Sequence, residues 1–292
     1  PSGASSVLAD LSYLAGENRV DFLACPYSFA DLDLLASRGW EEDAARQLRL
    51  GIEALGELGA KATGFVSPSF SLNDGTLRRL AEEGMGYAVV GADAVRYSSA
   101  GRRLLEGTTL SQPVRFVNSD GLLLKAFVLD ETLYSYLEGM PGGDTSHVIQ
   151  NIFAELAVLQ REKPNAVRSC VLAFPPNFTP SREFIDEFHE AVAGCPWLQT
   201  RRLSDLNSDQ FPLEGVALQA PAYEGQESPY LEELAEKKSL VADFTSVIPA
   251  EHALKGTLDR SLLVAENHRF TRDGDNAASR AYLSSIEAVV GG

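Results

Sequence analysis

The sequence predicts an α/β fold in which short strands alternate with helices and form a parallel sheet, either open or closed into a barrel. Short apolar runs that end at a proline, such as residues 19–25 before Pro26, are typical of buried parallel strands. Longer segments between them, such as residues 41–58, carry apolar side chains at helical spacing. After about Asp209 this alternation stops, and residues 213–292 are expected to form a helical appendage.

The expected elements follow one another in regular order. Strands are expected at residues 19–25, 62–66, 87–90, 122–129, 167–174 and 197–201. Helices are expected at residues 5–15, 41–58, 73–83, 147–162 and 181–193, and in the appendage at residues 230–238 and 276–289. Asn73 or Asp74 can cap the helix at 73–83, and Gly84 can end it.

The composition is that of a globular domain and disfavours two classes of partner. Of the 292 residues, 45% are hydrophobic, which is enough for a sizeable core. The 25 basic and 41 acidic residues give a net charge of −16, and such a field repels nucleic acids and anionic membrane surfaces. No apolar stretch approaches the roughly 18 residues of a membrane span, so we expect no membrane contact by this segment itself.

Neither a cofactor nor a metal is expected. The sequence contains no G-x-S-x-G elbow, no P-loop, no HExxH and no CxxC pair. The three cysteines, Cys25, Cys170 and Cys195, lack the spacing of metal ligands, and each lies in or after an apolar run. They are expected to be buried thiols, with one disulfide plus a free thiol as the alternative.

Three consecutive segments within residues 21–93 read DFLACPYSFADLDLL, DAARQLRLGIEALGELGAKATGF and VSPSFSLNDGTLRRLAEEGMGYAVV. Their order resembles that of the polysaccharide deacetylases with a NodB-homology domain, in the glycoside hydrolase/deacetylase barrel superfamily. The resemblance implies a distorted (β/α) barrel at residues 1–212 with its site at the C-terminal ends of the strands. The first strand of such a barrel is not present here, because the chain opens with a helix, so the barrel is expected to be incomplete.

The residues that would carry deacetylase chemistry are replaced in this sequence. The positions of the two metal-binding histidines fall on Cys25 and Phe29, and that of the orienting arginine falls on Val66. The position of the catalytic histidine falls on Phe174. The resemblance therefore implies a deacetylase-like barrel without a metal site, as in a pseudoenzyme.

Several short motifs occur in a characteristic order along residues 21–206. They are Pro26-Tyr27 with Asp31, Pro68 with Asp74-Gly75-Thr76-Leu77, Val128-Leu129-Asp130, Gln150 with Ala154-Glu155, Pro175-Pro176, and Cys195-Pro196-Trp197. This order resembles an uncharacterised actinobacterial family of envelope proteins with the same degenerate barrel. The resemblance implies a location in the cell envelope or outside the cell.

Three carboxylates are candidate catalytic residues, namely Asp130, Asp31 and Glu155. A carboxylate at a strand end can act as a general base or a nucleophile when burial or a neighbour tunes its pKa. Asp130 can equally cap a short helix at residues 131–137, and Asp31 can cap one at residues 32–37. Asp33 has the same two interpretations, catalytic or structural. Glu155 can also remain solvated on its helix.

The candidate ligand-binding residues are Tyr27, Ser67, Ser69, Asn177, Phe178 and Trp197, which follow the expected strands. The aromatic members could stack on the faces of sugars. Aromatic side chains such as Phe29 and Phe174 could instead fill the space of the lost metal site.

Two functions follow as hypotheses. The first is a non-catalytic, deacetylase-like domain of a cell-envelope protein that binds a cell-wall glycan or an envelope protein. The second is a carbohydrate-active hydrolase, either a glycosidase or a deacetylase, that uses carboxylates such as Asp130 with Asp31 or Glu155. Glycoside hydrolysis needs a pair of carboxylates across a cleft.

Overall fold

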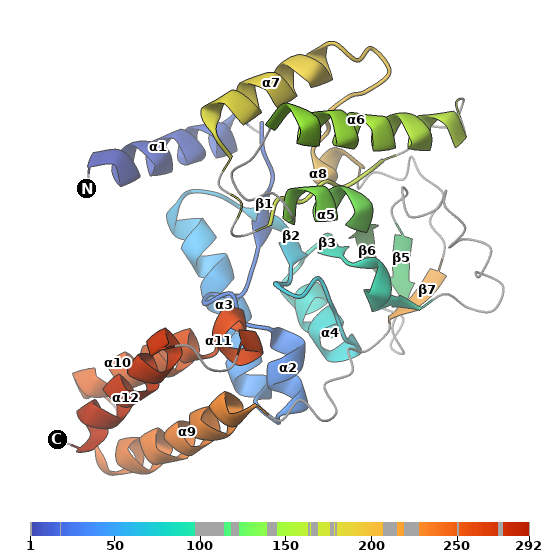
Figure 1. The fold of residues 1–292 in the computed structure, drawn as a ribbon. Helices are drawn as coiled ribbons and strands as arrows, with labels where there is room; N and C mark the ends of the chain where they lie inside the picture. Colours follow the sequence, from blue (N-terminus) through green and yellow to red (C-terminus); the bar gives the residue numbers. More distant parts are fainter. Residues whose placement is uncertain are drawn as a thin grey trace.

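The computed structural model describes residues 2–17, 19–96, 114–117, 123–138, 145–162, 164, 169–175, 178, 180–206, 215–218, 228–249, 251–273 and 277–291. These residues form a mixed α/β structure in which helices lie on both faces of one sheet and further helices pack at its side (Figure 1). The α/β fold class predicted from the sequence is therefore confirmed.

Within the described residues, seven strands form one sheet in the order β1-β2-β3-β6-β5-β7-β4. The strands are β1 (Phe22–Ala24), β2 (Ala62–Val66), β3 (Tyr87–Val90), β4 (Val95–Arg96), β5 (Val114–Val117), β6 (Leu123–Val128) and β7 (Gly215–Leu218). Strands β1, β2, β3 and β6 are parallel neighbours, whereas β5 is antiparallel to β6 and parallel to β7. The described strands do not close into a ring, which fits a distorted barrel.

The helices surround this sheet. They are α1 (Ser2–Gly16), α2 (Leu32–Ser37), α3 (Glu41–Glu57), α4 (Asp74–Glu82), the short 3₁₀ helix η1 (Ala92–Ala94), α5 (Glu131–Glu138), α6 (Thr145–Glu162), α7 (Arg182–Ala193), α8 (Leu203–Leu206), α9 (Pro229–Val247), α10 (Ala253–Ala265), α11 (His268–Asp273) and α12 (Ala277–Gly291).

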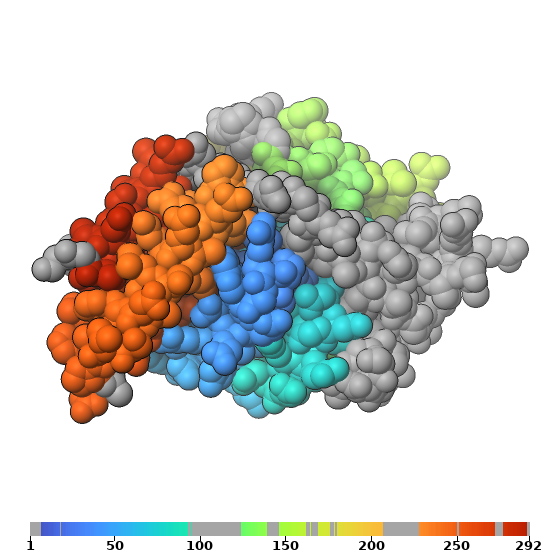
Figure 2. Space-filling model, turned by 90° about the horizontal axis from the view of Figure 1, so that it is seen from below, coloured from blue at the N-terminus to red at the C-terminus, as the bar shows by residue number. Residues whose placement is uncertain are grey.

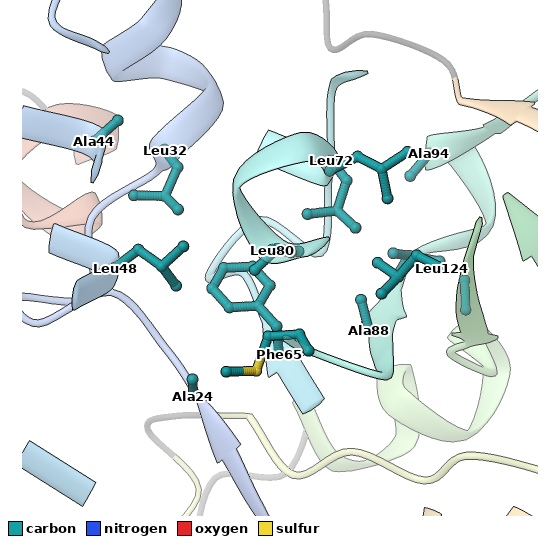
Figure 3. Packing of buried hydrophobic residues seen from close by; sticks show 14 of the residues in the cluster. Ala24, Leu32, Ala44, Leu48, Phe65, Leu72, Leu80, Ala88, Ala94 and Leu124 are labelled. Carbon is teal, nitrogen blue, oxygen red and sulfur yellow. The ribbon is translucent and has the colours of Figure 1, made fainter. Parts of the chain in front are cut away.

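One face of the sheet packs against α2, α3 and α4 to form the largest apolar cluster (Figure 3). Phe65 and Leu124 extend from the sheet toward Leu48 of α3 and Leu80 of α4, all of them almost fully buried. Burial of a side chain of this size contributes about 1.5–3 kcal/mol, so this layer supplies much of the stability of the fold.

Helices α5 to α8 cover the opposite face. In Figure 1 α5 lies over the sheet, with α6 and α7 above it. Tyr87, Val89 and Phe127 extend from the sheet toward this layer and contact Val171, Leu203 and Leu206. A parallel sheet needs a layer of helices on each face, because both of its faces are apolar.

The free edge of β1 is joined to α8 by side-chain hydrogen bonds. Asp21, the residue before β1, accepts hydrogen bonds from the backbone nitrogen and the hydroxyl group of Ser204, each at 2.7 Å. The Tyr87 hydroxyl group donates to the same carboxylate at 3.2 Å. Residues 183 positions apart in the chain are therefore held together at this edge.

Helices α9 to α12 form a second apolar cluster that packs against the N-terminal part of the chain. The orange surface of α9 adjoins the blue N-terminal region in Figure 2. Gln47 of α3 donates to the backbone oxygen of Leu263 at 2.8 Å and to Glu266 at 2.7 Å. Lys238 of α9 forms ion pairs with Asp43 and with Glu266, which is fully buried.

Most predicted elements are present, and two predicted strands are not. The region of the expected strand at 167–174 forms a single parallel bridge between Val171 and Leu129, and residues 165–168 lie outside the described residues. Residues 197–201 are not a strand, because the chain turns there and Leu198 donates to the backbone oxygen of Cys195 at 3.0 Å.

Three observed strands were not predicted, namely β4, β5 and β7. Strand β7 lies at Gly215–Leu218, inside the segment expected to be a helical appendage, and it pairs with β4 and β5. The helices of the appendage begin with α9, after residue 228.

Candidate functional site

A large cavity of about 1490 Å³ lies between the sheet and helices α5 to α8. Its floor comes from the C-terminal half of the strands, through Leu23, Val66 and Val89, and from the loops that follow them. Its roof comes from α5, α6 and α7 and from residues 169–174 and 197–206. The cavity therefore lies where a barrel of this kind holds its ligands.

The wall of the cavity combines aromatic, hydroxyl and amide groups. The aromatic side chains are Phe29, Phe70, Phe174, Phe188 and Trp197. The hydroxyl and amide side chains are Ser67, Gln160, Ser169, Gln199, Thr200 and Ser204. Phe29, Phe70 and Phe174 thus line the cavity and leave it open.

One carboxylate, Asp205, is among the described residues of the wall. Arg202 donates to it at 2.7 Å and 3.2 Å, and the hydrogen bond from Arg202 lowers the pKa of the carboxyl group. Asp205 is therefore an ionised partner of an arginine in this structure.

Two aromatic residues of the wall have an unusual backbone. Phe29 and Phe70 have φ angles of 60° and 52°, a region that residues other than glycine rarely adopt. Each ends a turn after a strand, since the nitrogen of Phe29 donates to the oxygen of Pro26 and the nitrogen of Phe70 to that of Ser67. Strained residues of this kind cluster at ligand-binding sites, so these two turns make the cavity a candidate site.

The Phe29 and Phe70 turns are held from outside. The backbone nitrogen of His268 donates to the oxygen of Phe29 at 3.0 Å, and that of Gly91 donates to the oxygen of Phe70 at 2.7 Å. The backbone of each turn is therefore held by a hydrogen bond from another part of the chain.

Asp130 and Glu155 do not line the cavity, but both act electrostatically on Cys170, which does. Asp130 caps α5, because its Oδ1 accepts from the backbone nitrogen of Leu133 at 3.0 Å, and its Oδ2 lies 3.8 Å from Cys170 Sγ. Burial, followed by the charges of Asp130 and Glu155, raises the pKa of the Cys170 thiol to about 12. Cys170 is thus a protonated thiol in the wall of the cavity, next to Asp130.

Asp31 caps a helix as well. Its Oδ1 accepts from the backbone nitrogens of Asp33 and Leu34, each at 3.1 Å, at the start of α2. The side chain is almost fully buried, and its Oδ2 lies 3.9 Å from Nδ1 of His268. Asp31 does not line the cavity.

A chain of hydroxyl groups connects the cavity wall to a second buried carboxylate. The Oγ atoms of Ser67 and Ser69 are 3.0 Å apart, and those of Ser69 and Ser71 are 2.7 Å apart. Ser71 donates to Oδ2 of Asp33 at 3.3 Å, and Thr76 donates to its Oδ1 at 2.6 Å. Burial and the charge of Asp31 raise the pKa of Asp33 to about 6.

The structure brings some of the predicted site residues together. Ser67 and Trp197 line the cavity, and Ser69 contacts Ser67. Phe178 stacks on Phe174 with a ring distance of 5.3 Å, outside the lining. Tyr27 is exposed and also lies outside the lining, and Asn177 lies outside the described residues.

The sequence analysis missed the role of Asp33 as the end of a hydroxyl chain and the polar groups at residues 199–204. Serines at positions 67, 69 and 71 follow β2 in the sequence, but residues 67–70 form a turn, so strand periodicity does not predict that their hydroxyl groups meet. No signal marks residues 199–204 either.

The cysteines and the remaining acidic groups form no metal centre in the described part of the chain. Cys25, Cys170 and Cys195 are free thiols, and burial raises the pKa of Cys25. No three His, Cys, Asp or Glu side chains among the described residues come together to hold an ion. None of the described helices is both long and apolar enough to cross a bilayer.

Comparison with known families gives two matches. Glycosyl hydrolase family 57 matches residues 3–165, and the family of unknown function DUF6049 matches residues 141–291. Each match covers more than half of the chain. No curated protein is similar enough in sequence to count as a match.

Solved structures of carbohydrate-active enzymes share the fold. The alpha-amylase AmyC from Thermotoga maritima has a TM-score of 0.69 at 12% identity, over 99% of this chain and 69% of its own. A GH57 branching enzyme from Thermococcus kodakaraensis has a TM-score of 0.68 at 13% identity, over 99% of this chain and 68% of its own. A 4-alpha-glucanotransferase from Thermococcus litoralis has a TM-score of 0.61 at 14% identity, over 98% of this chain and 48% of its own.

The glycoside hydrolase-like barrel expected from the sequence is thus confirmed. The narrower assignment to the NodB-homology deacetylases is not supported, because the matching family is glycosyl hydrolase family 57. The short motifs at strand ends were not specific enough to distinguish these two families.

Proposed function

The chain belongs to glycosyl hydrolase family 57 through residues 3–165 and to DUF6049 through residues 141–291, and from this premise we propose that it binds a carbohydrate in its cavity without cleaving it. The observation that carries the proposal is the wall of the cavity. Its aromatic rings can stack on sugar faces, and its hydroxyl and amide groups can bond to sugar hydroxyls.

The size of the cavity supports a ligand of several sugar units. Its volume of about 1490 Å³ exceeds the roughly 300–1,000 Å³ of pockets for single small molecules. The matching solved structures include an amylase, a glucanotransferase and a branching enzyme, so oligosaccharides of glucose are the first ligands to test. Cell-wall glycan strands are the second, in keeping with a domain of a cell-envelope protein.

The positions of the candidate carboxylates support binding without cleavage. Asp31 and Asp130 each cap a helix with one oxygen, and Asp205 is paired with Arg202. Glycoside hydrolysis requires two carboxyl groups about 5–10 Å apart across the scissile bond. Asp31, Asp130 and Asp205 already bond to helix ends or to an arginine, which supports a structural role for them over a catalytic one.

The test uses two aromatic residues of similar exposure. Trp197 is 43% exposed and lines the cavity, whereas Tyr27 is 44% exposed and lies outside its lining. Calorimetry with maltoheptaose and with peptidoglycan glycan strands should show binding that Trp197→Ala weakens at least tenfold, since burial of a large apolar side chain contributes about 1.5–3 kcal/mol. Tyr27→Ala is the matched control and should bind as the wild type does.

Absence of binding to either glycan, or an equal loss in the two variants, would contradict the proposal. If the purified protein binds neither glycan but is recovered with an envelope protein after crosslinking in cells, the partner is that protein and not a glycan. The proposed envelope location is tested by fractionation of the native host.

A carbohydrate hydrolase is the second candidate, and one observation favours it. Asp130 and Glu155 both raise the pKa of Cys170, which lines the cavity, so the charges of two carboxylates reach one point of the wall. Asp130→Asn retains an oxygen that can cap α5. If that variant abolishes a measurable release of reducing sugar by the wild type, the chain is an enzyme and not a binding domain.

A further inference from the structure

The hydroxyl chain from Ser67 to Asp33 is continuous and begins at the cavity wall. Its oxygen-to-oxygen steps are 3.0 Å, 2.7 Å and 3.3 Å, all within hydrogen-bond range. Ser67 and Asp33 are both buried, at 3% and 2% exposure, and Ser67 lines the cavity. A carboxylate inside the fold is therefore connected to the ligand space through three side chains.

The charge of Asp33 fixes the direction of every hydrogen bond in this chain. An ionised carboxylate can only accept, so Ser71 must use its one hydroxyl hydrogen to donate to Oδ2 of Asp33. Ser71 then accepts from Ser69, and Ser69 accepts from Ser67. With its hydrogen directed inward, Ser67 offers only oxygen lone pairs to the cavity.

We propose that Asp33 is a positioning residue that acts through Ser71 and Ser69 to make Ser67 a hydrogen-bond acceptor for a hydroxyl or N–H group of the ligand. The proposal rests on the proposed function. It states which ligand groups the floor of the cavity would bind, namely hydrogen-bond donors. Protonation of Asp33 reverses the chain and turns the hydrogen of Ser67 toward the ligand.

The surroundings of Asp33 explain why the chain can reverse. Thr76 occupies Oδ1, so a proton on the carboxyl group is placed on Oδ2, where it donates to Ser71. The nearest charged group is Asp31 at the cap of the same helix, and Asp31 in turn faces His268 of α11. The loop before α4 contributes the hydroxyl group of Ser71 and the backbone of Asn73.

The pKa of Asp33, about 6, places this reversal between pH 5 and pH 8. Below the transition, the Ser67 hydroxyl group directs its hydrogen at the ligand, so a ligand N–H group, or a ligand hydroxyl group that is held as a donor, loses its acceptor and the hydrogen bond. A lost hydrogen bond of this kind costs on the order of 1 kcal/mol, which corresponds to about three- to tenfold weaker binding.

The binding experiment measures the affinity for maltoheptaose at pH 8 and pH 5. The wild type should bind three- to tenfold more weakly at pH 5, and Asp33→Asn should bind at pH 8 as weakly as the wild type does at pH 5. Ser69→Ala breaks the chain and should remove the pH dependence, whereas Ser69→Thr keeps the hydroxyl group and should restore it.

Ser37→Ala is the matched control. Ser37 lies on α2 and donates to the backbone oxygen of Leu34 at 2.7 Å, outside the chain. This variant should keep the full pH dependence. A pH dependence that persists in Ser69→Ala, or that Ser37→Ala also removes, would overturn the proposal.

Neutron diffraction on crystals of the protein without any glycan tests the same proposal directly. At pH 8 the deuterium atoms should run from Ser67 to Ser69, from Ser69 to Ser71 and from Ser71 to Asp33, and at pH 5 they should run in the opposite sense. The same direction at both pH values refutes the reversal even if glycans bind. If the hydrogen bonds reverse but the protein binds no glycan, only the proposed function is refuted.

Discussion

Gly51 of α3 lies directly against the backbone oxygen of Cys25, because a Cβ at position 51 would be 1.9 Å from that oxygen. Helix α3 can approach the end of β1 this closely only without a side chain at this position. The contact fixes the height of α3 over the strand end that leads into the Phe29 turn.

Gly51→Ala is therefore expected to destabilise the protein by about 1–3 kcal/mol or more, since the backbone must move to admit a methyl group. Chemical denaturation measures the change. Gly56→Ala is the control on the same helix, because a Cβ there meets nothing within 4 Å. That substitution should stabilise the protein by about 0.5–1 kcal/mol, the usual gain when alanine replaces a helical glycine.

Lys238 should contribute to stability in a pH-dependent way. It pairs with the buried Glu266, whose pKa is raised to about 7, chiefly by burial. Removal of Lys238 leaves a buried charge without its ion-pair partner above pH 7, whereas at pH 5 Glu266 takes up a proton and is neutral. Breaking a buried pair costs about 3–5 kcal/mol, so Lys238→Met should lower stability by that amount at pH 8 and by much less at pH 5.

The neighbouring Lys237 provides the control for this measurement. It pairs with Glu287, whose side chain is 61% exposed. An exposed pair contributes about 0–1 kcal/mol, so Lys237→Met should have a small effect that is equal at the two pH values. Equal losses in the two variants at pH 8 would show that Glu266 is not a buried charge.

Asp33 should also make stability depend on pH. Its pKa is raised from 3.8 to about 6 in the folded state, so the folded protein holds this proton more tightly than the unfolded chain does. The stabilisation is complete below pH 3.8 and is lost as the pH rises through 6, by about 3 kcal/mol at most, since one pKa unit corresponds to 1.36 kcal/mol. Asp33→Asn should therefore be more stable relative to the wild type at pH 8 than at pH 5, as measured by urea denaturation at each pH.

Asp74→Asn is the control for that series, because Asp74 is an exposed residue of the first turn of α4. Its difference in stability from the wild type should be nearly the same at both pH values. A constant difference for Asp33→Asn would contradict the raised pKa.

The cap of α5 is a separate prediction. Asp130→Ala removes the acceptor for the backbone nitrogen of Leu133 and should lower stability by about 1 kcal/mol. Asp130→Asn keeps an oxygen at this position and should lose little. Thermal unfolding of both variants measures the difference, and an equal loss would mean that the charge of Asp130, through Cys170 or elsewhere, matters more than the cap.

The elements that the sequence predicted are those with a local signal. Strands β1, β2, β3 and β6 are apolar runs between turn residues, and all four are present. The caps by Asp31, Asn73 and Asp130 were alternatives in the sequence, and each is formed, because the nitrogens that they accept from lie two or three residues away.

The elements that the sequence did not predict depend on distant partners. Strand β7 pairs with β4 and β5, which come about 100 residues earlier in the chain. Residues 197–201 have the composition of a strand but line the cavity. In the site, Asp33 meets Ser71 and Thr76 across 38 and 43 residues, and no periodic pattern reports such a contact.

The bonds between Asp21 and Ser204 have a consequence for solubility. An uncovered edge strand exposes a row of backbone groups that can recruit a strand from another molecule and seed aggregation. Here a carboxylate, a hydroxyl group and a short helix occupy the flank of β1 and anchor another part of the chain there. Loss of the Asp21 carboxylate would therefore promote self-association before it impaired folding. With this edge covered, the sheet can remain open without aggregating through β1.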